Sequence, residues 1–192
     1  MSKMKIVIGQ GSCGIAAGAA KVYDALESAI KDGKLDAELS ITGCIGMCYL
    51  EPIAEVFTEE NGAMVRRTYV KLSDKTAEEF TSLIAEGDFE NLKKYEISEE
   101  DKKILASQTR VALRNCGNID PESIEEYVAA DGYKALEKVL KEMTPEEVIE
   151  VIKVSGLAGR GGAGFPTWFK WNAARSSKGE EKYLICNADE GD

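Results

Sequence analysis

The sequence contains no histidine, and this absence excludes more function classes than any other feature of its composition. Without imidazole there is no Ser/His/Asp or Cys/His catalytic group, no imidazole-ligated zinc and no common general base near neutral pH. Long apolar runs are missing too, since none approaches the roughly 18 to 20 residues of a membrane span. A basic, apolar and small-residue signal segment is also absent from the N-terminus. We therefore expect a cytoplasmic protein with no direct membrane span.

Positive charge is scarce relative to negative charge, with 24 basic and 34 acidic residues and a net charge of -10. Such a surface repels phosphate backbones and argues against a nucleic-acid partner. The hydrophobic fraction of 44% is too high for a disordered chain, and 192 residues allow one or two domains. Five cysteines, an odd number, in a reducing compartment favour metal, iron-sulfur or catalytic roles over disulfides.

The first 87 residues show the pattern of a small α/β domain. Hydrophobic periodicity and turn residues predict a strand, a glycine loop, a helix, a strand, a hairpin and a helix. The hairpin is indicated by Asn61-Gly62, because this pair fits the positive backbone angles of a type I′ turn. The predicted bounds are 3–8 for the first strand, 9–14 for the loop, 16–31 for the helix, 35–41 for the second strand, 53–58 and 64–70 for the hairpin, and 75–86 for the last helix. This order predicts a thioredoxin-like domain over residues 1–87.

Residues 88–109 are polar and charged, and we interpret them as a linker with a short helix. Beyond it, Asp120 and Pro121 predict the start of a helix to residue 130, and a second helix follows over 133–143. A capping box of Thr144 and Glu147 opens a third helix that ends near residue 156. A fourth helix is expected over 166–174. The apolar run 183–186 suits a short buried strand that delivers Asn187, Asp189 and Glu190 at its end.

A glycine cluster, Gly159 to Gly164, formally matches G-x-G-x-x-G. The segment before it is helical by period, whereas a Rossmann fingerprint follows a strand, and Phe165 stands where a Walker A loop needs lysine. Consecutive glycines expose backbone N–H groups that a phosphate or a flat ring can approach closely, and a helix N-terminus follows. Arg160 and Lys170 add positive charge. A flexible loop is the alternative, but four flanking aromatic residues favour a packed wall or a stacking surface.

Two strings in this region, GRGGAGFPTWFKW and YLICNADEGD, resemble the flavin-binding loop and the next strand of a known family. This is the flavoprotein subunit of respiratory NADH dehydrogenase, together with the diaphorase subunits of NAD-linked and electron-bifurcating hydrogenases and formate dehydrogenases. The preceding RNCGNIDPESIEEYVAADGYKALEKVL is similar to the lead-in helices of these proteins. The resemblance covers residues 110–192. It implies the helical and glycine-loop start of an α/β FMN-binding domain, incomplete within this sequence.

The family implies a role for each matching position. FMN would be wrapped by the glycine loop, contacted by a lysine, and met from the strand end by an amide and two carboxylates, while Phe165 would border the nicotinamide pocket. NADH would pass a hydride to the flavin, which releases electrons singly to iron-sulfur clusters. No catalytic side chain is assigned. The implied cofactor-binding residues are Gly159, Arg160, Gly161, Gly162, Ala163, Gly164, Phe165, Lys170, Asn187, Asp189 and Glu190.

Cys13, Cys44 and Cys48 are candidate metal ligands, because thiolates in adjacent loops suit an iron-sulfur cluster, which commonly takes four. The segments GQGSCGIAAGAAKVYDAL and TGCIGMC resemble the thioredoxin-like 2Fe-2S ferredoxin domain of the same flavoproteins. That family has a further cysteine about five positions before Cys13, where this sequence has Ile8, so one ligand of the 2Fe-2S centre is missing. A degenerate scaffold with free thiols is the alternative. Cys116 and Cys186 are expected to be small apolar fillers.

The leading hypothesis is the N-terminal part of an NAD(P)H-oxidising flavoprotein subunit that feeds the iron-sulfur carriers of a larger complex. The remaining FMN and NAD contacts and a 4Fe-4S motif would belong to a C-terminal part outside this sequence, so we expect the segment alone to be inactive. Its partners would be NADH and other redox subunits. The alternative is a non-catalytic thioredoxin-like docking or scaffold module. The terminal acceptor, the choice between NADH and NADPH and the oligomeric state are left open by the sequence.

Overall fold

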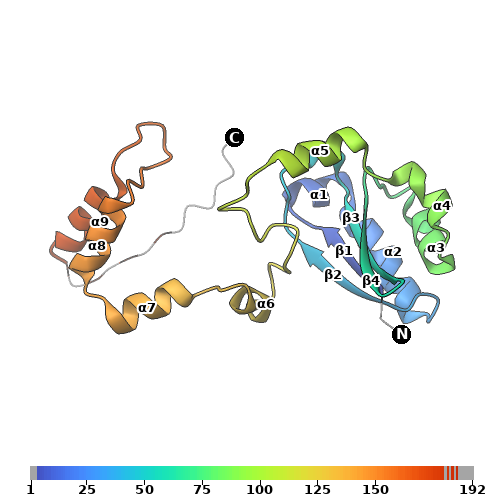
Figure 1. Ribbon diagram of the computed structural model, residues 1–192, viewed down its shortest axis with the longest axis horizontal. Helices are drawn as coiled ribbons and strands as arrows, with labels where there is room; N and C mark the ends of the chain where they lie inside the picture. Colours follow the sequence, from blue (N-terminus) through green and yellow to red (C-terminus); the bar gives the residue numbers. More distant parts are fainter. Residues whose placement is uncertain (1–3, 180, 182, 184, 186–192) are drawn as a thin grey trace. The chain divides into compact units, whose positions relative to one another are not determined.

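The computed structural model describes residues 4–179 together with 181, 183 and 185 (Figure 1). The chain divides into two compact units, Met1–Gly132 and Tyr133–Asp192, each of which is described by itself. Within the described ranges, no helix combines the length and the apolar character that crossing a membrane requires.

The first unit is built on a four-stranded sheet. Its strands are β1 (Met4–Gly9), β2 (Ala37–Thr42), β3 (Ala54–Glu60) and β4 (Ala63–Tyr69), in the order β2-β1-β3-β4. β1 pairs with β2 in parallel and with β3 in antiparallel, and β3 and β4 form a hairpin. A parallel β-α-β unit joined to an antiparallel hairpin in this order is the thioredoxin-like arrangement, as the sequence predicts.

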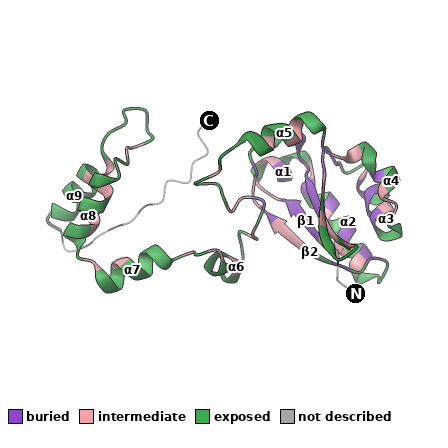
Figure 2. Cartoon of the chain, viewed as in Figure 1, coloured by how far each residue is buried: buried purple, intermediate pink, exposed green. Residues whose placement is uncertain are grey.

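The main core lies on one face of the sheet, against α2 (Ala19–Lys31) and α3 (Ala77–Glu86). Side chains alternate along a strand, so residues two apart share a face. Ile6 and Ile8 of β1 and Val56 of β3 are fully buried on it, and Leu26 and Phe80 meet them from the two helices. Figure 2 shows buried residues concentrated along these strands and helices.

The hairpin turn confirms the sequence prediction. Asn61 and Gly62 have φ angles of 52° and 79°, the left-handed values that a type I′ turn needs at both central positions. Asparagine and glycine reach these values at the least cost, which explains why the turn falls where it does.

The predicted loop over residues 9–14 is wrong in its second half. A short helix, α1 (Ser12–Ala17), begins there and is separated from α2 by Gly18. Gly18 has a φ of 103°, and its N–H closes the first helix on the carbonyls of Gly14 and Ile15. Cys13 therefore lies in the first turn of a helix rather than in an extended loop.

Residues 88–119 pack on the sheet of the first unit. They include α4 (Phe89–Leu92), the 3-10 turn η2 (Lys93–Tyr95) and α5 (Glu99–Ser107). Val70 N–H donates to the carbonyl of Tyr95 at 2.8 Å, and the buried Thr42 hydroxyl donates to the carbonyl of Ile119 at 3.1 Å. The division between the two units falls after Gly132, and the segment interpreted as a linker carries part of these contacts.

The structure confirms one predicted helix start and contradicts another. The capping box of Thr144 and Glu147 is confirmed at the start of α8 (Pro145–Val154). The predicted cap at Asp120 is wrong, because α6 (Ile124–Ala129) begins after Ser123, whose hydroxyl accepts from the N–H of Glu126. Asp120 instead accepts from Glu122 N–H at 2.8 Å, a local turn that competes with capping.

The second unit is helical in its described residues, with α7 (Lys134–Glu142), α8 and α9 (Thr167–Ser176). None of its described residues is buried, in contrast to the first unit (Figure 2). The strand predicted over 183–186 is not found at its described positions, since Tyr183 and Ile185 are more than 80% exposed and carry no strand. A buried strand needs a neighbouring strand and a cover, and the described part of this unit offers neither at these positions.

Phe80 generates a stability prediction, because its ring contacts Tyr69 and Tyr95 edge-on at centroid distances of 5.4 and 6.3 Å. We expect Phe80→Ala to lower the free energy of unfolding by about 3–5 kcal/mol, through lost burial and the cavity left behind. Val111→Ala, at a side chain that is 76% exposed, is the control and should change it by less than about 0.5 kcal/mol. Urea denaturation compares the two, and equal effects would contradict this description of the core.

Candidate functional site

Three cysteines meet at one end of the sheet in the first unit. The Sγ atoms of Cys13, Cys44 and Cys48 lie within 4.8 Å of one another, and those of Cys44 and Cys48 are 3.6 Å apart. Cys13 and Cys44 are half-buried, whereas Cys48 is exposed. The three residues that the sequence singled out as metal ligands are thus brought together.

The sheet topology explains this meeting. Because β1 and β2 are parallel, both run toward the same edge, and the segments that follow them start side by side. The segment after β2 is held by a second hydrophobic cluster, which includes Ile45, Met47 and Leu50. The first two of these residues lie between the two cysteines in the sequence, and Leu50 follows them. Arg110 also donates a hydrogen bond to the carbonyl of Ile45. The cysteine loop is therefore held by buried side chains, not only by its own backbone.

Glycine allows the two segments to approach closely. A Cβ added at Gly11 would lie 2.8 Å from the backbone nitrogen of Cys44 and 2.9 Å from its Cβ. A Cβ added at Gly14 would lie 2.4 Å from the carbonyl oxygen of Gly9. Real Cβ atoms do not come this near to backbone, so the spacing of the thiols depends on the missing side chains at these positions.

A buried carboxylate lies next to Cys13, and sequence reasoning missed it. Glu51 is only 8% exposed; its Oε2 accepts from Ile53 N–H at 2.9 Å, and its Oε1 accepts from the Cys13 thiol at 3.9 Å. Burial raises the pKa of this carboxyl group. Its position three residues after Cys48, directly before a proline, is the only signal in the sequence that could have drawn attention to it.

Two of the three thiols have raised pKa values. Burial, with smaller effects from the neighbouring cysteines, raises the pKa of Cys13 to about 12. The hydrogen bond with Cys44 raises the pKa of Cys48. A reactive cysteine needs a lowered pKa. A bound cation lowers the pKa of a thiol, because it favours the thiolate.

Ile8 occupies the position where the resemblance places another cysteine. Its side chain is fully buried in the main core, and its backbone pairs with Ile41 of β2 and with Ala54 of β3. It contributes to the fold and offers no ligand atom. At the position where the resemblance places a thiol, this chain therefore has a side chain that packs in the core.

The glycine loop of the second unit is closed at its neck. Ala158 and Pro166 form an antiparallel bridge, with Gly159 N–H donating to the carbonyl of Phe165 at 2.8 Å and Thr167 N–H donating to that of Leu157 at 3.0 Å. The amide of Gly159 is therefore used within the loop. Among the described residues, no backbone hydrogen bond is donated by residues 160–164.

The tip of this loop is open. A Cβ added at Gly161, Gly162 or Gly164 would meet no described atom within 4 Å. Gly162 and Gly164 have φ angles of 98° and 59°, the left-handed conformation found in backbone nests that bind anions. The tip thus offers unfilled space beside amides that have no backbone partner in the described part of the chain.

Of the side chains predicted to accompany the loop, the structure brings two to it. Lys170 Nζ would lie 2.7 Å from a Cβ at Gly159, and Phe165 packs edge-on against Phe169 at 5.5 Å. Lys153 Nζ lies 5.5 Å from the ring centre of Trp168. The other three predicted positions, Asn187, Asp189 and Glu190, lie outside the described residues.

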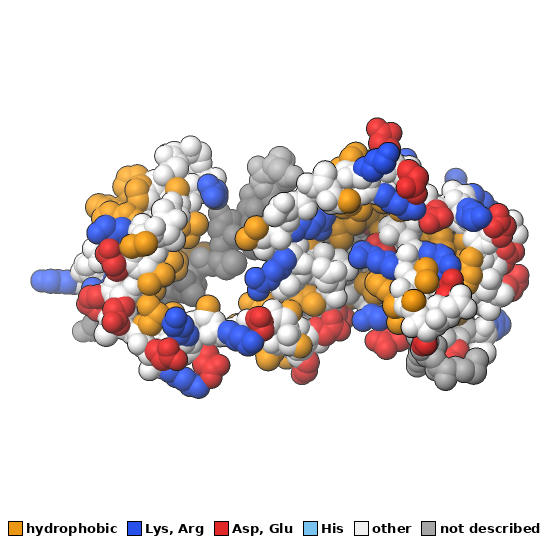
Figure 3. All heavy atoms as spheres, in the orientation of Figure 1, with side chains coloured by type: hydrophobic (Ala, Val, Ile, Leu, Met, Phe, Trp, Pro, Cys, Tyr) orange, Lys and Arg blue, Asp and Glu red, His pale blue; other side chains and the backbone are white. Residues whose placement is uncertain are grey.

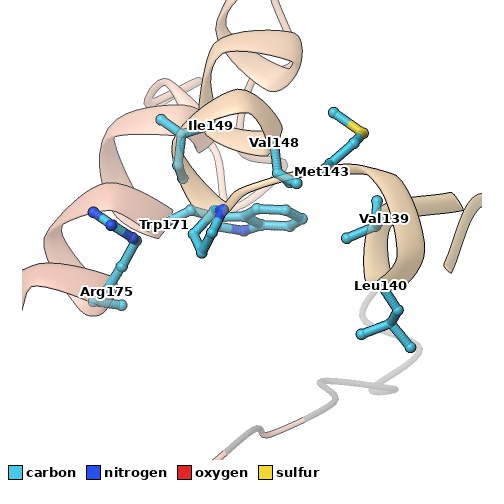
Figure 4. A pocket seen from close by; sticks show the side chains of 9 residues that line it. Val139, Leu140, Met143, Val148, Ile149, Trp171 and Arg175 are labelled. Atoms are coloured by element: carbon cyan, nitrogen blue, oxygen red, sulfur yellow. The ribbon is translucent and has the colours of Figure 1, made fainter.

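A separate hollow of about 570 Å³ in the second unit lies between α7, α8 and α9 (Figure 4). Trp171 lies at its centre, with Val148 and Ile149 on one side and Val139 on the other. Figure 3 shows hydrophobic side chains reaching the surface over these helices. Arg175 is a charged side chain that lines the hollow, and it is paired with Glu146. Its positive charge is therefore already compensated, so the hollow is a poor site for an anion.

Comparisons with known proteins point to one family. Residues 152–192 match the Nuo51 FMN-binding domain. The NADP-reducing hydrogenase subunit HndC of Solidesulfovibrio fructosivorans is 61% identical over 85 residues, which are 44% of this chain and 17% of the relative. One NADH-quinone oxidoreductase subunit of Rhizobium meliloti is 51% identical over 82 residues, 43% of this chain and 20% of the relative.

Residues 152–192 are thus similar to an FMN-binding domain, and the two relatives are subunits of an NADP-reducing hydrogenase and of an NADH-quinone oxidoreductase. The chain spans a fifth or less of the length of these two relatives. Among solved structures, a thioredoxin-like [2Fe-2S] ferredoxin from Aquifex aeolicus is 15% identical, with a TM-score of 0.41 over 52% of this chain and 100% of the ferredoxin. These sequence matches confirm the resemblance that the glycine loop indicates.

The close contact at Gly11 generates the second prediction. Gly11→Ala should push the cysteine loop away and lower the free energy of unfolding by about 1–3 kcal/mol, the usual cost of overpacking. The control is Gly43→Ala, one residue before Cys44, where an added Cβ meets nothing within 4 Å. Urea denaturation of both variants checks this, and a Gly11→Ala protein as stable as Gly43→Ala would contradict the tight packing.

Proposed function

We propose that this chain supplies the glycine-loop part of an FMN site and a thioredoxin-like iron-sulfur module to an NAD(P)H-oxidising enzyme. FMN, when bound, accepts a hydride from the nicotinamide and releases electrons one at a time. The electrons would pass to iron-sulfur clusters and to the other redox subunits of a larger cytoplasmic complex. The observation that carries the proposal is the open glycine loop inside the segment that matches an FMN-binding domain.

The loop residues suit a flavin phosphate or ring. The neck between Ala158 and Pro166 fixes where the loop begins and ends, and amides 160–164 make no bond to the described residues. Backbone N–H groups in left-handed turns bind anions without any side chain. Arg160 and Lys170 would add charge-assisted bonds in a chain of net charge -10. In this proposal, Asn187, Asp189 and Glu190 contact the flavin and its ribityl chain, and Phe165 borders the nicotinamide.

The three neighbouring thiols of the first unit support the iron-sulfur part of the proposed function. Iron-sulfur clusters are held by thiolates, and the first unit places three thiols together on a buried hydrophobic base. The hydrogen bond from Gly46 N–H to Cys44 Sγ, at 3.3 Å, is of the kind that stabilises a negatively charged sulfur. A 4Fe-4S centre and the remaining NAD(P)H contacts would belong to the rest of the enzyme.

A second candidate, a thioredoxin-like docking module without a cluster, is favoured by one observation. Ile8 fills the expected ligand position with core packing, and three thiols alone leave a cluster one ligand short. Iron and acid-labile sulfide analysis of the anaerobically purified chain separates the two candidates. A colourless, folded protein with neither element supports the docking module.

The flavin proposal is tested with the gene expressed through any coding sequence that follows Asp192. We expect a purified protein with an FMN spectrum that NADH or NADPH bleaches under anaerobic conditions. The two nucleotides are added separately, which also decides the cofactor preference. Absence of flavin after incubation with excess FMN would contradict the proposal.

Gly161→Ala in the same protein tests the loop itself. An added methyl meets no described atom within 4 Å, so we expect unchanged stability but weaker FMN binding. The affinity should fall about fivefold to a hundredfold, because overpacking costs about 1–3 kcal/mol and 1.4 kcal/mol is tenfold in affinity. Gly43→Ala, equally open but in the first unit, is the matched control. Fluorescence titration gives both affinities, and equal values would place FMN elsewhere.

A further inference from the structure

The carboxylate of Glu51 lies beside the thiols and has a free coordination position. It is more than nine-tenths buried, and its two oxygens have different roles. Oε2 is fixed by Ile53 N–H at 2.9 Å, whereas Oε1 has only the long contact of 3.9 Å from the Cys13 thiol among the described residues. A buried carboxylate oxygen ordinarily needs a strong partner, so Oε1 is the least satisfied atom of the site.

Two short contacts join donor atoms at this site, whose three Sγ atoms all lie within 4.8 Å of one another. Cys44 and Cys48 are separated by 3.6 Å between their Sγ atoms, and Cys13 Sγ and Glu51 Oε1 by 3.9 Å. Two ligands of one tetrahedral ion lie roughly 3.5–3.8 Å apart when the bonds are about 2.3 Å to sulfur and about 2.0 Å to oxygen. Each of these two contacts therefore has nearly the spacing of two ligands on a single ion, and four donor atoms in all suit a cluster of two ions.

The carboxylate also lies where a ligand from the end of β1 would be needed. A Cβ added at Gly9 would lie 3.1 Å from both Glu51 oxygens. A Cβ added at Gly14 would lie 3.2 Å from Oε2. Glu51 thus fills the space between the end of β1 and the start of α1, while Ile8 points into the core.

We propose that Glu51 is the fourth ligand of a two-iron cluster held by Cys13, Cys44 and Cys48, replacing the thiol that Ile8 cannot provide. This inference rests on the iron-sulfur part of the proposed function. On binding, the thiols and the carboxyl group release their protons, and Oε1 exchanges its contact with the Cys13 thiol for a bond to iron. The Ile53 N–H keeps the carboxylate oriented, as outer hydrogen bonds do for metal ligands.

The test uses the whole 192-residue chain, reconstituted anaerobically with ferric iron and sulfide. Glu51→Gln keeps an oxygen that can accept from Ile53 N–H but removes the anionic ligand. Cys116→Ser is the control, since this half-buried cysteine lies outside the three-thiol group. Glu51→Cys offers a thiolate in the same place. The readouts are iron and sulfide per chain, iron retention against a chelator and the EPR spectrum after reduction, with circular dichroism to check folding.

We expect the unmodified chain and Cys116→Ser to hold equal iron and sulfide with the same EPR spectrum. Glu51→Gln should retain iron at least about tenfold less well, because even outer-shell changes at metal sites cost that much. Glu51→Cys should hold a cluster with altered g values. If Glu51→Gln does not fold, the g values of Glu51→Cys decide: altered values support the ligand, and unchanged values overturn it.

Two further results would overturn the inference. One is a Glu51→Gln protein with the retention and spectrum of the unmodified chain, which would make Glu51 only a structural partner of Ile53. The other is an unmodified chain that takes up no iron and sulfide. That second result leaves the flavin part of the proposed function intact, because FMN bleaching is measured separately on the extended protein. Conversely, a cluster that depends on Glu51 stands even if no flavin binds.

Discussion

The close approach of two backbone segments beside β1 is the constraint on which the thiol site depends. The parallel pairing of β1 and β2 brings the segments that follow them to one edge, and Gly11 lets the first lie against Cys44 without an intervening side chain. Ile45, Met47 and Leu50 hold the second segment from the core side. The positions of the three thiols are thereby determined by the packing of the fold, and a site that is preorganised in this way avoids a large ordering cost on binding.

The glycine loop of the second unit is held in a different way. Its neck is closed by two backbone hydrogen bonds, and its tip makes no contact that an added Cβ would disturb. The described helices around it have no buried residue, and apolar side chains such as Leu140 and Val154 are more than 70% exposed. Helices of this length draw most of their stability from packing an apolar face. The loop therefore has a defined shape at its neck, while the helices around it would gain stability if their exposed apolar side chains were covered.

Local signals carried most of what the sequence could predict. The Asn61-Gly62 turn and the Thr144 capping box each need only adjacent residues, and both are found as expected. The three cysteines were found because their spacing is read directly along the chain. The predicted cap at Asp120 is wrong because Ser123, three residues later, caps the helix instead. The side-chain hydrogen bonds of the folded chain decide between the two residues, and Asp120 accepts from Glu122 N–H rather than from the helix.

Glu51 shows what a pattern cannot supply. Only its place between Cys48 and a proline distinguishes it from the many other acidic residues of this chain, and its carboxylate lies against Gly9 and Gly14 on another segment. A buried carboxylate is costly unless a partner compensates it, and the fold gives Oε2 such a partner but leaves Oε1 facing a thiol. Glu55, also buried, contrasts with it, because Arg66 and Thr68 satisfy both of its oxygens. One carboxylate is thus fully used by the fold, and the other keeps an oxygen available at the site where three thiols converge.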